Sequence, residues 1–293
     1  MAFVLVLVSS SIPLAIGHLA ITEETLAEQK ISRMGPPMWI ESNKAAQMVI
    51  ANKPNPEQIK ELRGKLNQYR IDIFIVAPEN RRKKLLVADM DSTVITSETL
   101  DEIAIKAGIA DQVIPITERA MRGELDFEQA LHERVALLKD QPESLLHDVL
   151  KETKLSAGIE TLTATMHSAD YHCVLLTGGF TFFASVIAAR AGFNHFHGNE
   201  LEIKDHVLTG KVIPPILDKD AKLSFMRQYM AQYDLTADDV LAIGDGANDL
   251  PMLLEAGFGV GYKPKPLLLE TLDNCIIYGD LTSLLYVQGY RAA

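Results

Sequence analysis

The feature that most constrains the fold is an apolar run at residues 85–88 that ends abruptly in Asp89 and Asp91. The run, Leu-Leu-Val-Ala, is apolar on both faces of an extended strand, and such strands lie in the middle of helix-covered sheets. Residues 173–176 and 240–243 are similar runs, and each also ends in a polar or glycine-rich loop. Ligands bind beyond the carboxyl ends of strands in open α/β sheets, so these loops are expected to meet at one site.

Taken singly, the motifs in these loops have ordinary structural explanations. Aspartates at D-x-D spacing cap helices and occupy turns, and Gly178-Gly179 alone predicts a turn. Lys222 alone predicts a solvated surface lysine. The motifs of the three loops occur in order, each closing an apolar strand, and this favours a shared functional site over unrelated turns.

The motifs together resemble those of phosphoserine phosphatases of the haloacid dehalogenase superfamily. They are Asp89-Met90-Asp91-Ser92-Thr93, Thr177-Gly178-Gly179-Phe180, Lys222 in Asp220-Ala221-Lys222, and Gly244-Asp245-Gly246-Ala247-Asn248-Asp249. The resemblance extends from about residue 85 to about residue 280, and residues 1–80 match only loosely. It implies an α/β fold in which a Rossmann-like parallel sheet carries an inserted helical cap.

Composition limits the class of protein. A length of 293 residues exceeds the usual size of a single core and predicts two domains. A hydrophobic content of 47% with 23% charged residues is typical of a soluble globular protein. The net charge of −11 argues against nucleic acid as a partner, because nucleic-acid phosphates need a basic surface.

The first residues superficially resemble a signal peptide, but no Lys or Arg precedes the apolar run, and residues 9–13 interrupt it with serines and a proline. No apolar segment approaches the ~18 residues of a membrane span. Cys173 and Cys275 lie in apolar runs, which predicts reduced core thiols. We therefore expect a cytoplasmic enzyme without a membrane partner.

Residues 1–80 predict a separate α+β domain. Strands are expected at residues 3–8 and at 71–75, where the alternation of residues predicts a half-buried strand. A hairpin is expected at 38–50, and helices at 13–29 and from Pro56, with Asn55 as N-cap. This β-α-β-β-α-β order is the ferredoxin-like plan, which ACT modules also use. The first loop lacks a glycine that would let the backbone close on an amino acid, so a structural or dimerising role is favoured over sensing. The sequence leaves open whether the chain forms a homodimer.

Residues 81–293 are assigned to the phosphatase domain, with a helical cap at about residues 98–154. The basic run at 81–84 predicts a solvated linker. In the cap, Asp126 is expected to cap a helix whose Phe127, Leu131 and Val135 share one face. A hairpin is expected within residues 194–213. Its His195 and His197 lack a clear third metal ligand, so exposed polar residues are favoured there over a metal site.

The D-x-D spacing has a chemical meaning on an extended segment, where residues i and i+2 point the same way. Asp89 and Asp91 then face one space. This arrangement suits a two-step phosphoryl transfer, in which Asp89 attacks phosphorus to give an aspartyl-phosphate. Asp91 protonates the departing alkoxide and then activates water.

The resemblance also implies a magnesium site and a phosphate site. The metal ligands are Asp89, the backbone carbonyl of Asp91, and Asp245, since oxygen ligands suit Mg²⁺. The residues implied for the transferring oxygens and for holding the metal shell are Thr177, Gly178, Gly179, Lys222, Asn248 and Asp249. The family more often has serine at Thr177, and the hydroxyl is retained. A neighbouring carboxylate raises the pKa of Asp91 and a metal lowers it, and the sequence leaves open which dominates.

Substrate specificity is expected from the cap. Glu98 and Arg134 match family residues that pair with the ammonium and carboxylate of the substrate, and a guanidinium suits a carboxylate better than lysine does. Met121 and Phe127 match residues that line the closed cap. Taken alone, Arg134 predicts a solvated charge on a helix, and Met121 and Phe127 predict ordinary core residues.

The function implied is magnesium-dependent hydrolysis of O-phospho-L-serine, the last step of serine biosynthesis. An alternative is a phosphatase of the same superfamily for another small phosphomonoester. From a different class, the chain fits a phosphoryl-accepting signalling protein or a serine-binding module, although Asp91 argues against a stable phosphoryl state.

Overall fold

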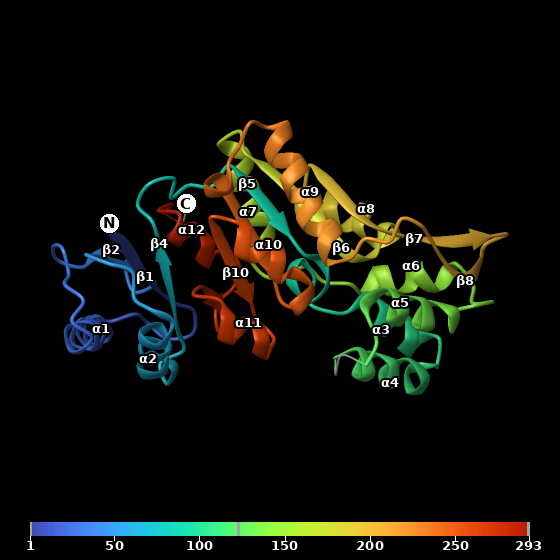
Figure 1. Ribbon diagram of the computed structural model, residues 1–293, viewed down its shortest axis with the longest axis horizontal. Coiled ribbons are helices and arrows are strands. Elements are labelled where there is room, and N and C mark those ends of the chain that lie inside the picture. Colours follow the sequence, from blue (N-terminus) through green and yellow to red (C-terminus); the bar gives the residue numbers. More distant parts are fainter. Residues whose placement is uncertain (1, 122–123, 292–293) are drawn as a thin grey trace. The chain divides into compact units, whose positions relative to one another are not determined.

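The computed structural model describes residues 2–121 and 124–291 (Figure 1). Its first part is a four-stranded antiparallel sheet in the order β2-β3-β1-β4. The strands are β1 (Phe3–Ser9), β2 (Met38–Glu41), β3 (Ala45–Ile50) and β4 (Ile71–Val76), and the helices are α1 (Ile16–Glu28) and α2 (Pro56–Asn67). The predicted β-α-β-β-α-β order is therefore confirmed. Asn55 caps α2 as expected, accepting the backbone N–H of Gln58 at 2.9 Å.

The second sheet has seven strands in the order β11-β10-β9-β5-β6-β7-β8. They are β5 (Leu85–Ala88), β6 (His172–Phe180), β7 (His195–Lys204), β8 (Val207–Ile213), β9 (Val240–Gly244), β10 (Phe258–Tyr262) and β11 (Cys275–Ile276). β9, β10 and β11 pair in parallel, as do β6 and β7, while β8 returns antiparallel to β7. The expected mostly parallel α/β sheet is confirmed, and the expected hairpin is β7–β8.

Two groups of helices accompany this sheet. Those of the sheet connections are α7 (Ile159–Ser168), α8 (Thr181–Ala191), α9 (Lys219–Gln232), α10 (Leu250–Glu255), α11 (Pro266–Thr271) and α12 (Ser283–Val287). Between β5 and β6 lie α3 (Thr99–Lys106), α4 (Ala110–Met121), α5 (Phe127–Ala136) and α6 (Ser144–Glu152). Asp126 caps α5 by accepting the N–H of Gln129 at 2.8 Å. The chain forms two compact units, one of residues 1–86, 157–172 and 230–293, and the other of residues 87–156 and 173–229.

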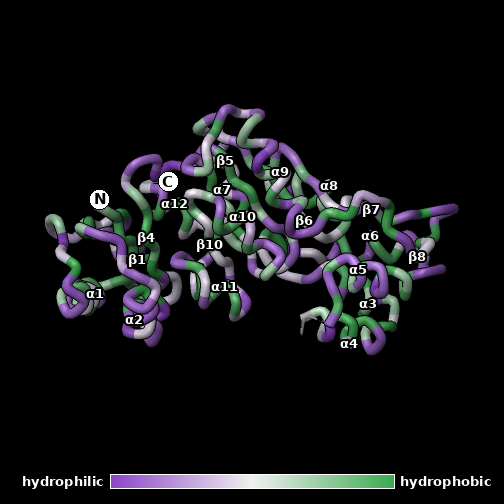
Figure 2. The backbone as a smooth tube through the Cα atoms, viewed as in Figure 1, coloured by the Kyte–Doolittle hydropathy of each residue, from purple (hydrophilic) through white to green (hydrophobic). Residues whose placement is uncertain are grey.

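The central strands are apolar on both faces, as their sequences predict. Every side chain of β5 is buried, as are residues 173–176 of β6 and 240–243 of β9. Figure 2 shows hydrophobic residues along β1, β4 and β5. In the first sheet a separate cluster that includes Leu5, Leu7 and Ile73 packs with α1 and α2 residues such as Leu26 and Leu62.

The expectation that β4 is half-buried is wrong, because both of its faces are covered. Asp72, which alternation would place in solvent, is only 2% exposed. Its carboxylate accepts the backbone N–H groups of Ile277 and Gly279 at 2.9 and 2.8 Å. Burial raises the pKa of Asp72, and these hydrogen bonds oppose the rise. The C-terminal segment thus packs on the first sheet.

The basic run at residues 81–84 is only partly solvated, because Arg82 and Lys84 are exposed whereas Lys83 is buried and Arg81 is half-buried. Lys83 is 3% exposed and donates to the Asp238 carbonyl at 2.6 Å. Arg81 donates to the Val287 and Tyr286 carbonyls, and burial lowers the pKa of Arg81 to about 10. The cations are retained because backbone carbonyls replace the water that they lose.

The histidines of β7 are not exposed polar residues. The ring of His197 stacks on Phe225 with centroids 3.9 Å apart, and Nε2 lies 2.8 Å from the Tyr229 hydroxyl. The ring centroids of His195 and Tyr229 lie 4.9 Å apart. These contacts with α9 give both histidines a packing role.

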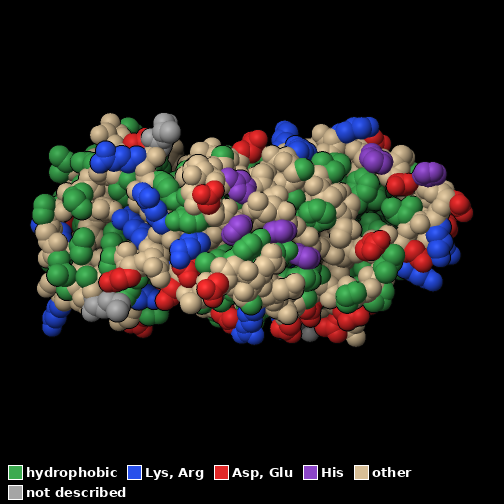
Figure 3. All heavy atoms as spheres, turned by 90° about the horizontal axis from the view of Figure 1, so that it is seen from above, with side chains coloured by type: hydrophobic (Ala, Val, Ile, Leu, Met, Phe, Trp, Pro, Cys, Tyr) green, Lys and Arg blue, Asp and Glu red, His purple; other side chains and the backbone are tan. Residues whose placement is uncertain are grey.

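Three further features are the state of the two cysteines, the distribution of surface charge and the hydropathy of the helices. Cys173 and Cys275 are buried free thiols, as predicted. Acidic and basic side chains are interspersed over the face drawn in Figure 3. Among the helices of the described residues, none combines the length and hydropathy that a membrane span requires.

Candidate active site

The first element of the site is the turn that follows β5. Asp89 is buried at the end of the strand, and the chain then folds back, so that the Ile95 N–H donates to the Met90 carbonyl at 2.9 Å. This reversal requires a left-handed conformation at Ser92, with φ of 55°. Asp91 Oδ1 accepts the N–H of Thr99, the first residue of α3, at 2.8 Å. Asp91 therefore satisfies a helix N-terminus while it stays beside Asp89.

Asp91 is placed to hold a proton near neutral pH. Burial, followed by the negative charge of Glu98, raises the pKa of Asp91 to about 6, and the Thr99 N–H opposes the rise. A carboxyl with this pKa exchanges a proton readily at neutral pH, as an acid and base must. Burial and the neighbouring carboxylate therefore set the direction in which the protein shifts this pKa.

The glycine loop expected at residues 177–180 forms the last part of β6, and it packs against Asp91 and the cap. Thr177 Oγ1 donates to Asp91 Oδ2 at 3.3 Å and accepts the Gly179 N–H at 2.8 Å. A Cβ on Gly179 would lie 2.6 Å from Asp91 Oδ2, and one on Gly178 would lie 2.8 Å from the Phe127 ring. The close approach of these side chains explains why the loop needs two glycines.

Lys222 on α9 is a buried partner of Asp89. Its side chain is 1% exposed, and Nζ lies 2.6 Å from Asp89 Oδ1. The interpretation of Lys222 as a surface lysine is therefore excluded. A buried ammonium beside a carboxylate is also placed to meet phosphate oxygens.

Asn199, which the sequence did not single out, ties two parts of this site together. Its amide is fully buried on β7 and donates to the Gly178 carbonyl at 2.8 Å and to the Leu217 carbonyl at 3.3 Å. Its Oδ1 accepts the Leu217 N–H at 2.6 Å. The amide thus joins the glycine loop to the segment that leads into Lys222.

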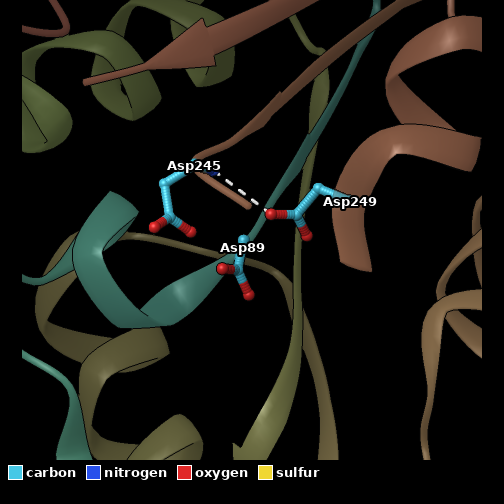
Figure 4. Close-up of side chains that lie close together, drawn as sticks. All are labelled: Asp89, Asp245 and Asp249. Carbon is cyan, nitrogen blue, oxygen red and sulfur yellow. Dashed lines mark hydrogen bonds between the residues drawn. The ribbon is translucent and has the colours of Figure 1, made fainter. Parts of the chain in front are cut away.

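The loop after β9 brings two further carboxylates to Asp89. Carboxylate oxygens of Asp89, Asp245 and Asp249 lie within 4.8 Å of one another, and all three residues are buried. Asp249 Oδ2 accepts the N–H groups of Asp245 and Gly246, each at 3.2 Å, and Figure 4 marks the first of these bonds. Asn248 lies in the same short helical turn, Ala247–Asp249.

This donor set fits a divalent metal. Three buried carboxylates cannot share so small a space without cations, because the repulsion between their charges is strong at low dielectric. Oxygen-only ligands suit a hard ion such as Mg²⁺. Lys222 on Asp89 and Lys265 on Asp245 supply positive charge in this structure, the latter at 3.0 Å. Sequence reasoning missed Lys265, which follows Asp245 by twenty residues without any motif.

The residues expected to read the substrate lie on the cap side of the turn. Glu98 Oε1 accepts a hydrogen bond from the Ser92 hydroxyl at 2.8 Å. Arg134 on α5 donates through Nε to the Ala130 carbonyl at 3.0 Å. Burial lowers the pKa of Arg134, and the negative charges of Asp101, Glu98 and Asp91 oppose this decrease. Phe127 contacts Gly178, whereas the side chain of Met121 lies outside the described residues.

Known proteins resemble this chain in sequence and in structure. A phosphoserine phosphatase of Archaeoglobus fulgidus is 36% identical over 80% of this chain and 69% of its own length. One of Mycobacterium tuberculosis is 38% identical over 71% of this chain, and the chain spans about half, 51%, of that relative.

Two solved structures extend the comparison. A HAD family hydrolase of Salmonella enterica serovar Typhi, 28% identical, superposes with a TM-score of 0.84 over 98% of both chains. A phosphoserine phosphatase solved as a phospho-aspartyl intermediate analogue, 36% identical, gives 0.66 over 70% of this chain and 98% of its own. Residues 86–254 match the model of the haloacid dehalogenase-like hydrolase family. With its acidic cluster, buried lysine and glycine loop in place, this chain belongs to the haloacid dehalogenase-like hydrolases.

Proposed function

We propose that the protein is a phosphatase that hydrolyses O-phospho-L-serine to L-serine and phosphate with the help of Mg²⁺. The observation that carries this proposal is the pairing of Asp89 with buried Lys222 beside Asp91, whose pKa is about 6. A nucleophile, a proton donor and a cation for phosphate oxygens are thereby adjacent. The names of the relatives support phosphoserine as the substrate.

In the first step Asp89 attacks phosphorus and forms an aspartyl-phosphate, while Asp91 gives its proton to the serine alkoxide. In the second step Asp91 takes a proton from the water that hydrolyses the acyl-phosphate. Lys222, the Thr177 hydroxyl and the N–H groups of the glycine loop bind the transferring oxygens. The solved phospho-aspartyl intermediate analogue of a relative supports this assignment.

The metal in this proposal is Mg²⁺, held by Asp89, the backbone carbonyl of Asp91, and Asp245. When bound, the ion offsets the repulsion between the Asp89 carboxylate and the phosphate dianion. Asp249 supports the site by fixing the backbone around Asp245. Asn248, which lies in the same loop, is assigned a role in binding phosphate.

Specificity is assigned to the cap, residues 98–154 of a phosphatase domain at 81–293 that follows an ACT-like domain at 1–80. Glu98 pairs with the ammonium of the substrate, Arg134 pairs with its carboxylate, and Phe127 and Met121 line the closed cap. Buried free thiols support a reducing compartment such as the cytoplasm. We also propose that the chain forms a homodimer. A measurement of the oligomeric state in solution tests this proposal.

The direct test is phosphate release from O-phospho-L-serine with and without Mg²⁺. The D-enantiomer and phosphothreonine, measured alongside, report how closely the amino-acid groups are read. We expect metal-dependent turnover that is fastest with the L-enantiomer. Equal turnover of simple phosphomonoesters that lack both amino-acid groups would contradict phosphoserine as the substrate.

Replacing Arg134 with alanine is expected to lower kcat/KM for phosphoserine by roughly 10- to 150-fold. The estimate corresponds to the loss of ~1.5 to 3 kcal/mol from a charged hydrogen-bonded pair. Turnover of phosphoethanolamine, which has no carboxylate, should change little. Arg119→Ala is the matched control, because Arg119 is a cap arginine with a 42% exposed side chain. Equal losses on both substrates would contradict the role assigned to Arg134.

A further inference from the structure

Lys265 contacts Asp245 at two points. Its backbone N–H donates to the Asp245 carbonyl at 2.9 Å, and its Nζ lies 3.0 Å from Asp245 Oδ2. Lys265 is also the residue that precedes α11, where Pro266 fixes the first turn. The loop backbone is therefore anchored in place, and the ammonium is held on one particular oxygen of the metal-site carboxylate.

The same pattern holds for each carboxylate of the acidic cluster. Asp89 Oδ1 is bonded to Lys222 Nζ at 2.6 Å. Asp249 Oδ2 accepts two backbone N–H groups, and Asp245 Oδ2 is bonded to Lys265. Each carboxylate thus has at least one oxygen engaged by a donor of the protein. A cation that binds through both oxygens of Asp245 has to displace Lys265 from Oδ2.

Divalent cations differ in what they require of a carboxylate. Mg²⁺ requires nearly ideal octahedral geometry with close oxygens, whereas Ca²⁺ accepts more ligands and commonly takes both oxygens of one carboxylate. A lysine that occupies one oxygen therefore disfavours the larger ion more than the smaller one.

We propose that Lys265 is a positioning residue that restricts Asp245 to coordination through one oxygen and thereby favours Mg²⁺ over Ca²⁺. The inference rests on the metal-dependent function proposed above and names the residue that selects the metal. Lys265 acts through Asp245, and its side chain is 46% exposed, so it lies outside the buried core.

The test is calorimetric titration of the full chain, stripped of metal by a chelator, with MgCl2 and with CaCl2 in the absence of substrate. In Lys265→Met we expect the ratio of the Ca²⁺ and Mg²⁺ dissociation constants to fall by about tenfold, the scale on which groups behind metal ligands act. Lys263→Met is the matched control. Lys263 is an exposed lysine on the same loop whose Nζ lies over the Tyr262 ring, 5.1 Å from its centroid. Its loss removes the same charge and should leave the ratio unchanged.

Three outcomes overturn the inference. An unchanged ratio in Lys265→Met would show that the lysine does not select the ion. An equal gain in affinity for both cations would show a loss of charge repulsion alone. If the wild-type chain bound neither cation, the metal dependence of the proposed function would fail as well, and this result is distinct from the other two. Thermal unfolding of each variant checks that the fold is intact.

Discussion

Asp89→Asn is expected to abolish phosphoserine hydrolysis, with a loss in kcat of ~10⁴-fold or more, as for other nucleophiles. The amide has nearly the same shape as the carboxylate but cannot attack phosphorus. The substitution also removes the negative charge that lies 2.6 Å from the buried ammonium of Lys222. Phosphate release measured at saturating substrate and Mg²⁺ gives the loss directly.

A control separates chemistry from folding in this experiment. Asp111→Asn changes an exposed aspartate of α4 and should keep full activity. The substitution breaks the ion pair with Lys222 but also relieves repulsion from Asp245 and Asp249, so thermal unfolding is measured together with turnover. A folded Asp89→Asn variant with undiminished turnover would remove Asp89 as the nucleophile.

Lys222→Met is expected to lower kcat by about 10²- to 10³-fold, the usual cost of losing one group that stabilises charge in a transition state. Methionine occupies most of the buried space that Lys222 fills at 1% exposure, and thermal unfolding checks that the variant is folded. Without the ammonium, the phosphate oxygens and Asp89 lose a cation that neither water nor methionine replaces. Single-turnover and steady-state phosphate release measure the loss.

The matched control is Lys219→Met, on the first turn of the same helix, where the side chain is exposed. It removes the same charge about one turn away and should retain activity within roughly twofold, because exposed charges interact weakly across water. Equal losses in the two variants would mean that Lys222 acts through net charge, and not by contact with the phosphate.

Local signals determined much of the fold. Asn55 and Asp126 begin helices because their side chains bond to N–H groups three residues later. The apolar run at 85–88 forms a central strand because neither of its faces suits water. The parallel sheet follows from three such strands, and the loops that end them carry Asp89, Thr177 and Asp245. These features depend on residues that are close in sequence, so they can be predicted from the sequence alone.

Burial of polar groups was decided by partners that are distant in sequence. Asp72 and Lys83 look like solvent-facing charges in their own segments, but residues near 277 and 238 supply their hydrogen-bond partners. His197 was expected in solvent for the same reason, although α9 supplies its aromatic neighbours. No local pattern reports such a partner.

The sequence by itself determined the order of strands and helices, because capping and alternation act over a few residues, and its family resemblance named the residues that are proposed to react. Only the tertiary structure decided that Asn199 joins two loops, that Lys222 is buried on Asp89 and that Lys265 holds Asp245. The physical reason is that a charge or an amide takes its role from whatever replaces its lost water, and here that replacement comes from segments about 20 to 130 residues away.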